Sequence, residues 1–129
     1  MTLREQQSVF ALNFAKLVIF ANENGYEITH GEGWRTHDQQ VLYFEGYTII
    51  KVGSTLKLAK CTTRSKTMFS KHLKKLAHDI NLFYKGRLLG SAKKDREHWK
   101  ILADYWRALH PENESGYDWG WDLGHFQMN

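Results

Sequence analysis

The sequence has few residues that form disulfides or break helices and strands: its 129 residues include one cysteine, Cys61, and one proline, Pro111. A single cysteine excludes an intrachain disulfide and a zinc site built from several cysteines, and it suits folding in a reducing compartment. No internal repeat is present. With 42% hydrophobic residues and a high aromatic content, the chain is expected to fold as one domain, residues 1–129, around one core.

A long hydrophobic run is also missing. The most apolar stretch, Val9–Ala21, is interrupted by polar residues, is too short to span a bilayer, and is not followed by a small-residue cleavage site. We therefore expect neither an export signal nor a transmembrane segment. Apolar residues recur there at helical spacing, which predicts an amphipathic helix over about Leu3–Glu23, with Thr2 and Glu5 as a capping box.

Acidic residues are absent from one long segment. Between Gly46 and His78 there are eight basic residues, while the other ten basic residues face all fourteen acidic ones, so the formal charge of +4 comes from this segment. Two interpretations stay open: a solvated loop surface, or attraction to a polyanion such as wall polymer, outer-membrane lipid or nucleic acid. No recognisable nucleic-acid motif is present, so we expect no nucleic-acid partner. The basic residues are Lys51, Lys57, Lys60, Arg64, Lys66, Lys71, Lys74 and Lys75.

The remaining patterns mix helical and strand periods. Leu76–Phe83 alternates as a strand does, and the turn at Lys85-Gly86 predicts a hairpin with residues 87–89. A buried stripe that includes Trp99 and Trp106 predicts a helix that ends before Pro111. Helices with an antiparallel sheet, and no βαβ alternation, predict an α+β fold. Further expected elements are a strand at Tyr26–Thr29, a helix capped by Thr36, a strand at Tyr47–Val52 followed by a long basic loop, a Gly- and aromatic-rich loop at Asn113–Trp121, and a last strand at His125–Met128.

Two short segments carry side chains that suit a metal ion. His72 precedes the predicted strand, Asp79 lies on it, and His125 begins the last strand. Imidazole and carboxylate groups are standard zinc ligands, and a catalytic zinc site uses three of them and keeps one position open. Asp122 would then be a base that takes a proton from water and returns it to a leaving amine. Arg35 could hold a substrate carboxylate or a developing oxyanion.

These residues also have a plainer interpretation. The chain has seven histidines, and a single histidine is more often a surface or hydrogen-bonded residue than a ligand. Trp34, Trp119 and Trp121 could be packing residues or platforms for a substrate. Spacing alone leaves both alternatives open.

A resemblance to a known family adds to this picture. The pattern Ser70-x-His72-x4-Ala77-x-Asp79, followed downstream by Asp122-x-x-His125, resembles the zinc motif of the M15 peptidases. That family includes D-Ala-D-Ala carboxypeptidases, vancomycin-resistance dipeptidases and phage L-alanyl-D-glutamate endolysins. The segments at residues 3–7, 32–39 and 77–83 are similar to the family as well, in matching order. The chain departs from the family in two places: Lys75 stands where many members have Gly, and Asp122 where many have Glu.

The resemblance implies a small antiparallel sheet with flanking helices, as in the D-Ala-D-Ala peptidase and Hedgehog group. It implies that His72, Asp79 and His125 hold one zinc ion, that Asp122 is the general base, and that Arg35 binds the substrate or the transition state. It further implies Ser70 as a supporting hydrogen-bond residue. We add Gln39, Trp119 and Trp121 as substrate contacts to be tested.

The expected function is zinc-dependent hydrolysis of a peptide bond in bacterial peptidoglycan, first as a phage endolysin with L-alanyl-D-glutamate endopeptidase activity. A D-Ala-D-Ala carboxypeptidase or dipeptidase is the alternative. A non-catalytic nucleic-acid-binding module, or a relative that binds zinc and does not cut, are further alternatives. We expect a monomer whose partners are the peptidoglycan stem peptide and, through the basic segment Lys51–Lys75, an anionic envelope surface. It would be made in the host cytoplasm and act on the wall after release.

Overall fold

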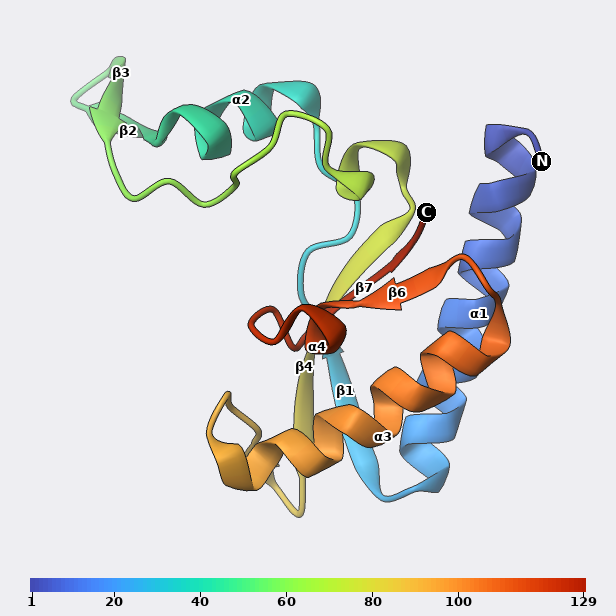
Figure 1. The fold of residues 1–129 in the computed structure, drawn as a ribbon. Coiled ribbons are helices and arrows are strands. Elements are labelled where there is room, and N and C mark those ends of the chain that lie inside the picture. The colour runs from blue at the N-terminus through green and yellow to red at the C-terminus, as the bar shows by residue number, and fades with distance from the viewer.

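The computed structural model describes all residues, 1–129, and its elements alternate irregularly between helices and strands (Figure 1). Two long helices and two shorter ones accompany seven strands and one 3₁₀ turn. Their bounds are α1 Leu3–Glu23, β1 Tyr26–His30, α2 His37–Glu45, β2 Tyr47–Val52, β3 Thr55–Lys60, η1 Lys71–Lys74, β4 Ala77–Tyr84, β5 Arg87–Leu88, α3 Lys93–Leu109, β6 Asn113–Ser115, α4 Gly116–Trp119 and β7 His125–Met128.

The main sheet is antiparallel, with strand order β1-β4-β7-β6 and β5 added beside β4. The long strand β4 is its axis: one part of β4 pairs with β1, and the part that starts at Ala77 pairs with β7. A separate two-stranded sheet is formed by β2 and β3. The predicted α+β class, a small antiparallel sheet flanked by helices, is therefore confirmed.

The core lies between the sheet and the helices α1 and α3. Trp106 of α3 is fully buried, and its ring meets Phe10 of α1 and Phe126 of β7 edge-on, with ring centroids 5.6 and 5.8 Å apart. Its indole N–H donates to the carbonyls of Glu114 and Gln127 at 3.1 Å, which joins α3 to β6 and β7. This packing holds the strand that carries His125.

Most predicted elements are present. The first helix covers Leu3–Glu23 with both hydrogen bonds of the capping box between Thr2 and Glu5, and the hairpin at Lys85-Gly86 forms with both residues at positive φ. Two predicted loops are wrong. Residues 55–60 of the expected basic loop form β3, because a turn at Gly53 folds them back onto β2. The region 113–121 contains β6, because Asn113–Ser115 pairs with β7, and then the short helix α4.

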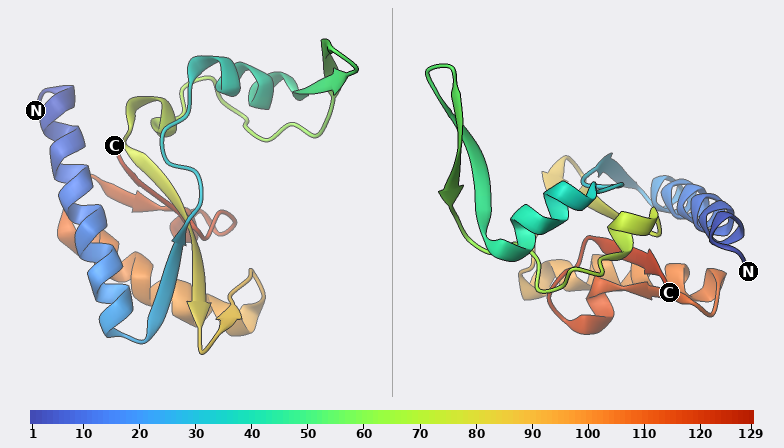
Figure 2. Two further views of the ribbon diagram at one scale, coloured as in Figure 1. Left: turned by 180° about the vertical axis from the view of Figure 1, so that it is seen from behind. Right: turned by 90° about the horizontal axis from the view of Figure 1, so that it is seen from above.

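The hairpin of β2 and β3 lies apart from the main sheet, at the far end of α2 (Figures 1 and 2). Neither strand contains a buried residue. We call residues 47–60 the hairpin arm. None of the helices has both the length and the apolar character needed to cross a membrane.

Candidate metal centre

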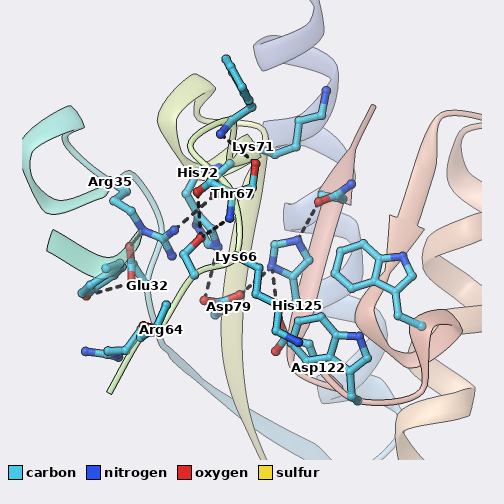
Figure 3. A pocket seen from close by; sticks show the side chains of 18 residues that line it. Glu32, Arg35, Arg64, Lys66, Thr67, Lys71, His72, Asp79, Asp122 and His125 are labelled. Carbon is cyan, nitrogen blue, oxygen red and sulfur yellow. Dashed lines mark hydrogen bonds and ion pairs between the residues drawn. The ribbon is translucent and has the colours of Figure 1, made fainter. Parts of the chain in front are cut away.

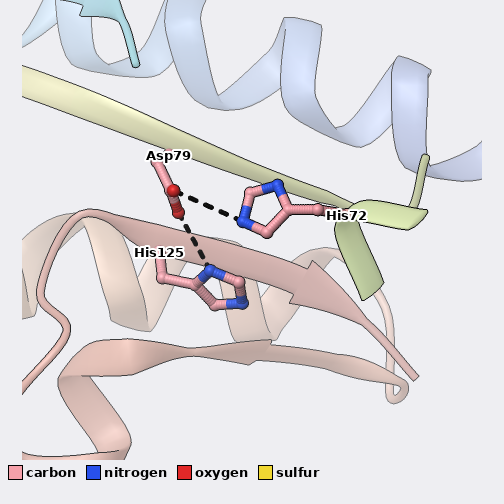
Figure 4. Close-up of side chains that lie close together, drawn as sticks. All are labelled: His72, Asp79 and His125. Atoms are coloured by element: carbon pink, nitrogen blue, oxygen red, sulfur yellow. Dashed lines mark hydrogen bonds and ion pairs between the residues drawn. The ribbon is translucent and has the colours of Figure 1, made fainter. Parts of the chain in front are cut away.

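Three side chains from separate elements converge at the junction of β4 and β7 (Figure 4). Asp79 and His125 are partners in the antiparallel register, which places them side by side, and His72 projects from η1 just before β4. His125 Nδ1 lies 2.9 Å from Asp79 Oδ1, and His72 Nε2 lies 3.3 Å from Asp79 Oδ2. One donor atom from each residue falls within 4.8 Å of the other two. Both imidazoles are buried.

A 3₁₀ turn aims His72 at this junction. Ser70 begins the turn, and its hydroxyl accepts a hydrogen bond from the backbone N–H of His72. Lys75 ends the turn with φ of 58°, in the left-handed region that favours glycine. Its position is therefore one where the glycine of many M15 peptidases would fit without strain.

Hydrogen bonds on the far side of each imidazole determine which nitrogen faces Asp79. His72 Nδ1 lies 2.6 Å from the Gly33 carbonyl, which can only accept, so Nδ1 carries a proton and Nε2 faces Asp79. His125 Nε2 lies 2.8 Å from Gln127 Oε1. The amide nitrogen of Gln127 donates to Glu114 and Asn129, so its oxygen is the atom that faces His125. Neutral His125 therefore keeps its proton on Nε2 and presents bare Nδ1 to Asp79.

This donor set fits a divalent cation. In their neutral forms the two imidazoles direct nitrogen lone pairs toward the Asp79 carboxylate. Three hydrogen-bond acceptors therefore meet, and none of them carries a proton to share. Either added protons or a metal ion must occupy the space between the acceptors. Two imidazole nitrogens and one carboxylate oxygen are the ligand types of a catalytic zinc site, and the partners at Gly33 and Gln127 are of the kind that orient histidine ligands.

The electrostatics of the cluster favour positive charge between the side chains. Burial opposes ionisation of Asp79, yet hydrogen bonds from the protonated imidazoles of His125 and His72 hold its pKa well below the usual range. Burial disfavours the charged form of His125, but Asp79 and Gln127 together raise its pKa above that of a free imidazole. Protons and a metal ion would therefore compete for the same site.

Asp122 lies beside the cluster rather than in it. Its Oδ2 is 3.9 Å from His125 Nδ1, and burial raises the pKa of its carboxyl. A carboxyl group with a raised pKa next to a cation site is suited to accept and return a proton. The role of Asp122 as a base outside the ligand set stays a prediction.

Arg35 lines the same pocket as the cluster, and other residues hold its guanidinium. Its guanidinium forms an ion pair with Glu32 and donates to Gln40 Oε1 at 2.6 Å and to Ser70 Oγ at 3.3 Å. Most of its donors therefore already have partners within the protein. The Ser70 hydroxyl accepts hydrogen bonds from the Arg35 guanidinium and from the backbone N–H of His72.

The cluster opens into a pocket of about 660 Å³ (Figure 3). Its lining includes Trp119 and Trp121, both exposed, and contact of these two rings with a substrate stays a prediction. Gln39 lines a separate cavity between α2 and the hairpin arm, outside this pocket. The neighbouring Gln40 is fully buried and contacts Arg35. Sequence reasoning missed Gln40, and it also missed Arg64, Lys66, Phe69 and Gln127 in the pocket wall.

The central antiparallel strands of this α+β fold carry the His-Asp-His cluster. The fold itself, without reference to the cluster, is shared with a solved structure. The chain superposes on the L-Ala D-Glu endopeptidase ChiX of Serratia marcescens with a TM-score of 0.60 and 20% sequence identity. The match covers 98% of this chain and 85% of that one. No protein-family profile matches the chain, and a search of curated proteins finds no significant match.

Proposed function

We propose that this protein is a zinc-dependent peptidase of the M15 type that hydrolyses a peptide bond in bacterial peptidoglycan. The observation that carries the proposal is the convergence of His72, Asp79 and His125, with both imidazoles oriented by hydrogen bonds so that their free nitrogens face the same carboxylate. The shared fold with an endopeptidase for L-Ala–D-Glu bonds supports the substrate class.

The residues around the cluster supply the remaining parts of an amide hydrolase. Zinc, when bound by the three side chains, supplies the Lewis acidity that polarises a carbonyl and makes water easier to deprotonate. Asp122 takes a proton from the attacking water and delivers it to the leaving amine, for which its raised pKa is suited. Trp119 and Trp121 flank the pocket and bind the peptide through their exposed ring faces.

The substrate is a stem peptide that carries carboxylates, and the pocket wall has cations to match. Arg64 and Lys66 come from the segment after β3 and line the pocket with no carboxylate partner. We assign them, rather than the internally paired Arg35, to the substrate carboxylates; Arg35 remains a positioning residue that steadies Ser70 and η1. The first candidate for the bond cut is L-Ala–D-Glu, in a phage endolysin that acts as a monomer on the wall after release from the host cytoplasm.

Metal analysis combined with a peptidoglycan digest tests the proposal. Purified protein should contain about one zinc ion per chain. It should release fragments from purified peptidoglycan that mass spectrometry identifies as products of L-Ala–D-Glu cleavage, and a chelator should stop the release until zinc is restored. Products that lack a terminal D-Ala would instead identify a D-Ala-D-Ala carboxypeptidase.

Asp79→Ala is the decisive variant, with the exposed residue change Asp38→Asn as a control. Removing the carboxylate that both imidazoles face should abolish zinc binding and hydrolysis together, while the control should keep both. Circular dichroism checks that both variants fold. A folded Asp79→Ala protein that still cleaves peptidoglycan would refute the proposed metal centre.

A further inference from the structure

The hairpin arm has a surface that the proposed peptidase chemistry does not use. Five large aliphatic side chains on its fourteen residues are 40–70% exposed: Ile49, Ile50, Val52, Leu56 and Leu58. Exposed aliphatic side chains are ordinary when scattered singly, but a group of this kind on one element marks an interaction site. The arm extends away from the core (Figure 2), and all five side chains are exposed.

Both faces of the hairpin combine these aliphatic groups with lysine. The register pairs Ile49 with Leu58 and Lys51 with Leu56, so these four side chains share one face. On the other face Ile50 pairs with Lys57. Lys51, Lys57 and Lys60 are all exposed, and no acidic residue occurs anywhere between Gly46 and His78. The arm is thus apolar and cationic at the same time.

We propose that the hairpin arm docks on an anionic phospholipid bilayer, with its aliphatic side chains among the acyl chains and its lysines at the headgroups. A bilayer is the partner that takes both properties together, since its interior accepts aliphatic side chains and its anionic headgroups attract lysine. Long lysine side chains can extend past neighbouring apolar groups to reach the headgroup level.

Other occupants match only one of the two properties. Single-stranded nucleic acid binds through stacking on aromatic rings, and Tyr47 is the only aromatic residue in the arm. A second copy of the hairpin would bring two sets of three lysines together with no acidic residue to balance them. Peptidoglycan itself offers little apolar surface for the aliphatic side chains.

Docking through the arm would leave the pocket accessible. The arm consists of residues 47–60, whereas the pocket lining begins again at Thr63 after the hairpin and otherwise comes from distant segments. The membrane contact is therefore independent of the proposed hydrolysis, and each can fail without the other.

Vesicle binding by the purified protein tests the inference without any substrate. The protein should sediment with vesicles of equimolar phosphatidylglycerol and phosphatidylcholine, and not with vesicles of phosphatidylcholine alone. Replacing Lys51, Lys57 and Lys60 by Gln should weaken binding about fivefold for each lysine removed, because each basic group near an anionic surface has roughly that effect. Leu56→Ser with Leu58→Ser should weaken binding by at least about tenfold.

Matched controls on other elements separate the arm from general charge and stickiness. Lys16, Lys93 and Lys94, each exposed on α1 or α3, are replaced by Gln, and the exposed pair Leu12 and Ile19 by Ser. These controls should bind vesicles as the wild type does. The proposal is overturned if the wild type ignores anionic vesicles, or if the arm variants and the controls bind equally well. Sedimentation velocity without lipid also overturns it if the arm proves to hold a dimer instead.

Discussion

The junction of β4 and β7 and the hairpin arm are both built from antiparallel strands, yet they are stabilised in opposite ways. The junction lies within the main sheet, where Leu82, Phe126 and Met128 are fully buried against α1 and α3. The arm has its own strand pairing and no buried residue. Only the junction brings ionisable side chains from separate segments within hydrogen-bonding distance.

The difference indicates what the proposed metal centre requires of its surroundings. Each imidazole at the junction is held by a partner behind it, the Gly33 carbonyl for His72 and Gln127 for His125. Gln127 is held in turn by Glu114. A two-stranded hairpin without a core cannot hold its side chains in fixed positions in this way. Its side chains are therefore suited to a deformable partner such as the proposed bilayer. The main sheet fixes the positions of its side chains, whereas the hairpin arm leaves its side chains exposed.

Among substitutions that leave His72, Asp79 and His125 in place, Asp122→Asn should have the largest effect on activity at the junction. The amide keeps the shape of the side chain but cannot take a proton from water, so kcat should fall by about 10²–10⁴-fold while zinc content stays at the wild-type level. Peptide release from peptidoglycan and metal analysis on the same sample measure both. Asp38→Asn, at an exposed position on α2, is the control. A fully active Asp122→Asn protein would remove Asp122 from the mechanism.

Truncating one leucine in each region tests the energetic side of the comparison. Leu82→Ala empties a fully buried site in β4 and should lower the free energy of unfolding by about 2–5 kcal/mol. Leu58→Ala in the arm, where the side chain is 63% exposed, should change it by less than about 0.5 kcal/mol. Urea titrations of the two variants give both numbers. Equal losses would mean that the arm packs against the body in solution.

The same contrast decides how much of the fold could be predicted from the sequence. The helices α1 and α3 and the strand β4 bury one face against a core, so their apolar residues recur with the period of the element. The strand β3 has no buried residue, so its sequence of leucines and lysines could not be told from that of a basic loop. The short strand β6 is set by pairing with β7, which no local pattern indicates, and α4 follows it directly as a single short helix.

The candidate site divides in a similar way. His72, Asp79, His125 and Asp122 could be picked from residue type and from the family resemblance, and the fold brings them together. The groups that orient the two imidazoles, Gln127 and the Gly33 carbonyl, could not be picked from the sequence. A glutamine and a backbone carbonyl have no chemical signature there. The only available signal for Gln127 was its place two residues after His125 on a strand, which puts both side chains on one face. Arg35 pairs with Glu32 and Gln40, three and five residues away, but residue types alone do not show which neighbours the chain brings to the guanidinium.

Gln127→Leu should weaken zinc binding about 10–100-fold without disturbing the core. The change removes the acceptor for His125 Nε2–H, so the imidazole loses the tautomer that presents Nδ1 to the metal. Competition with a chelator measures the affinity, and ¹⁵N NMR of the His125 ring reports the tautomer. Gln127→Glu keeps an acceptor at the same place and should recover part of the affinity, although Glu114 lies next to it. Unchanged affinity and tautomer in Gln127→Leu would show that Gln127 has no orienting role.

The smallest effect is expected on the pH dependence of the free energy of unfolding. It should come from an ion pair outside both regions, which joins β5 to the first turn of α3. The Arg87 guanidinium and the backbone N–H of Gly90 lower the pKa of the Asp95 carboxyl to about 2, from an ordinary value of 3.8. The folded state therefore binds the Asp95 proton less tightly than the unfolded state does. The stabilisation is complete above pH 3.8 and is lost as the pH falls toward 2. In urea titrations, wild type should be more stable than Asp95→Asn at neutral pH, and the gap should narrow steadily below about pH 4. Asp38→Asn should show no such pH-dependent gap, and a gap for Asp95→Asn that persists unchanged at low pH would mean that this carboxylate contributes packing rather than charge.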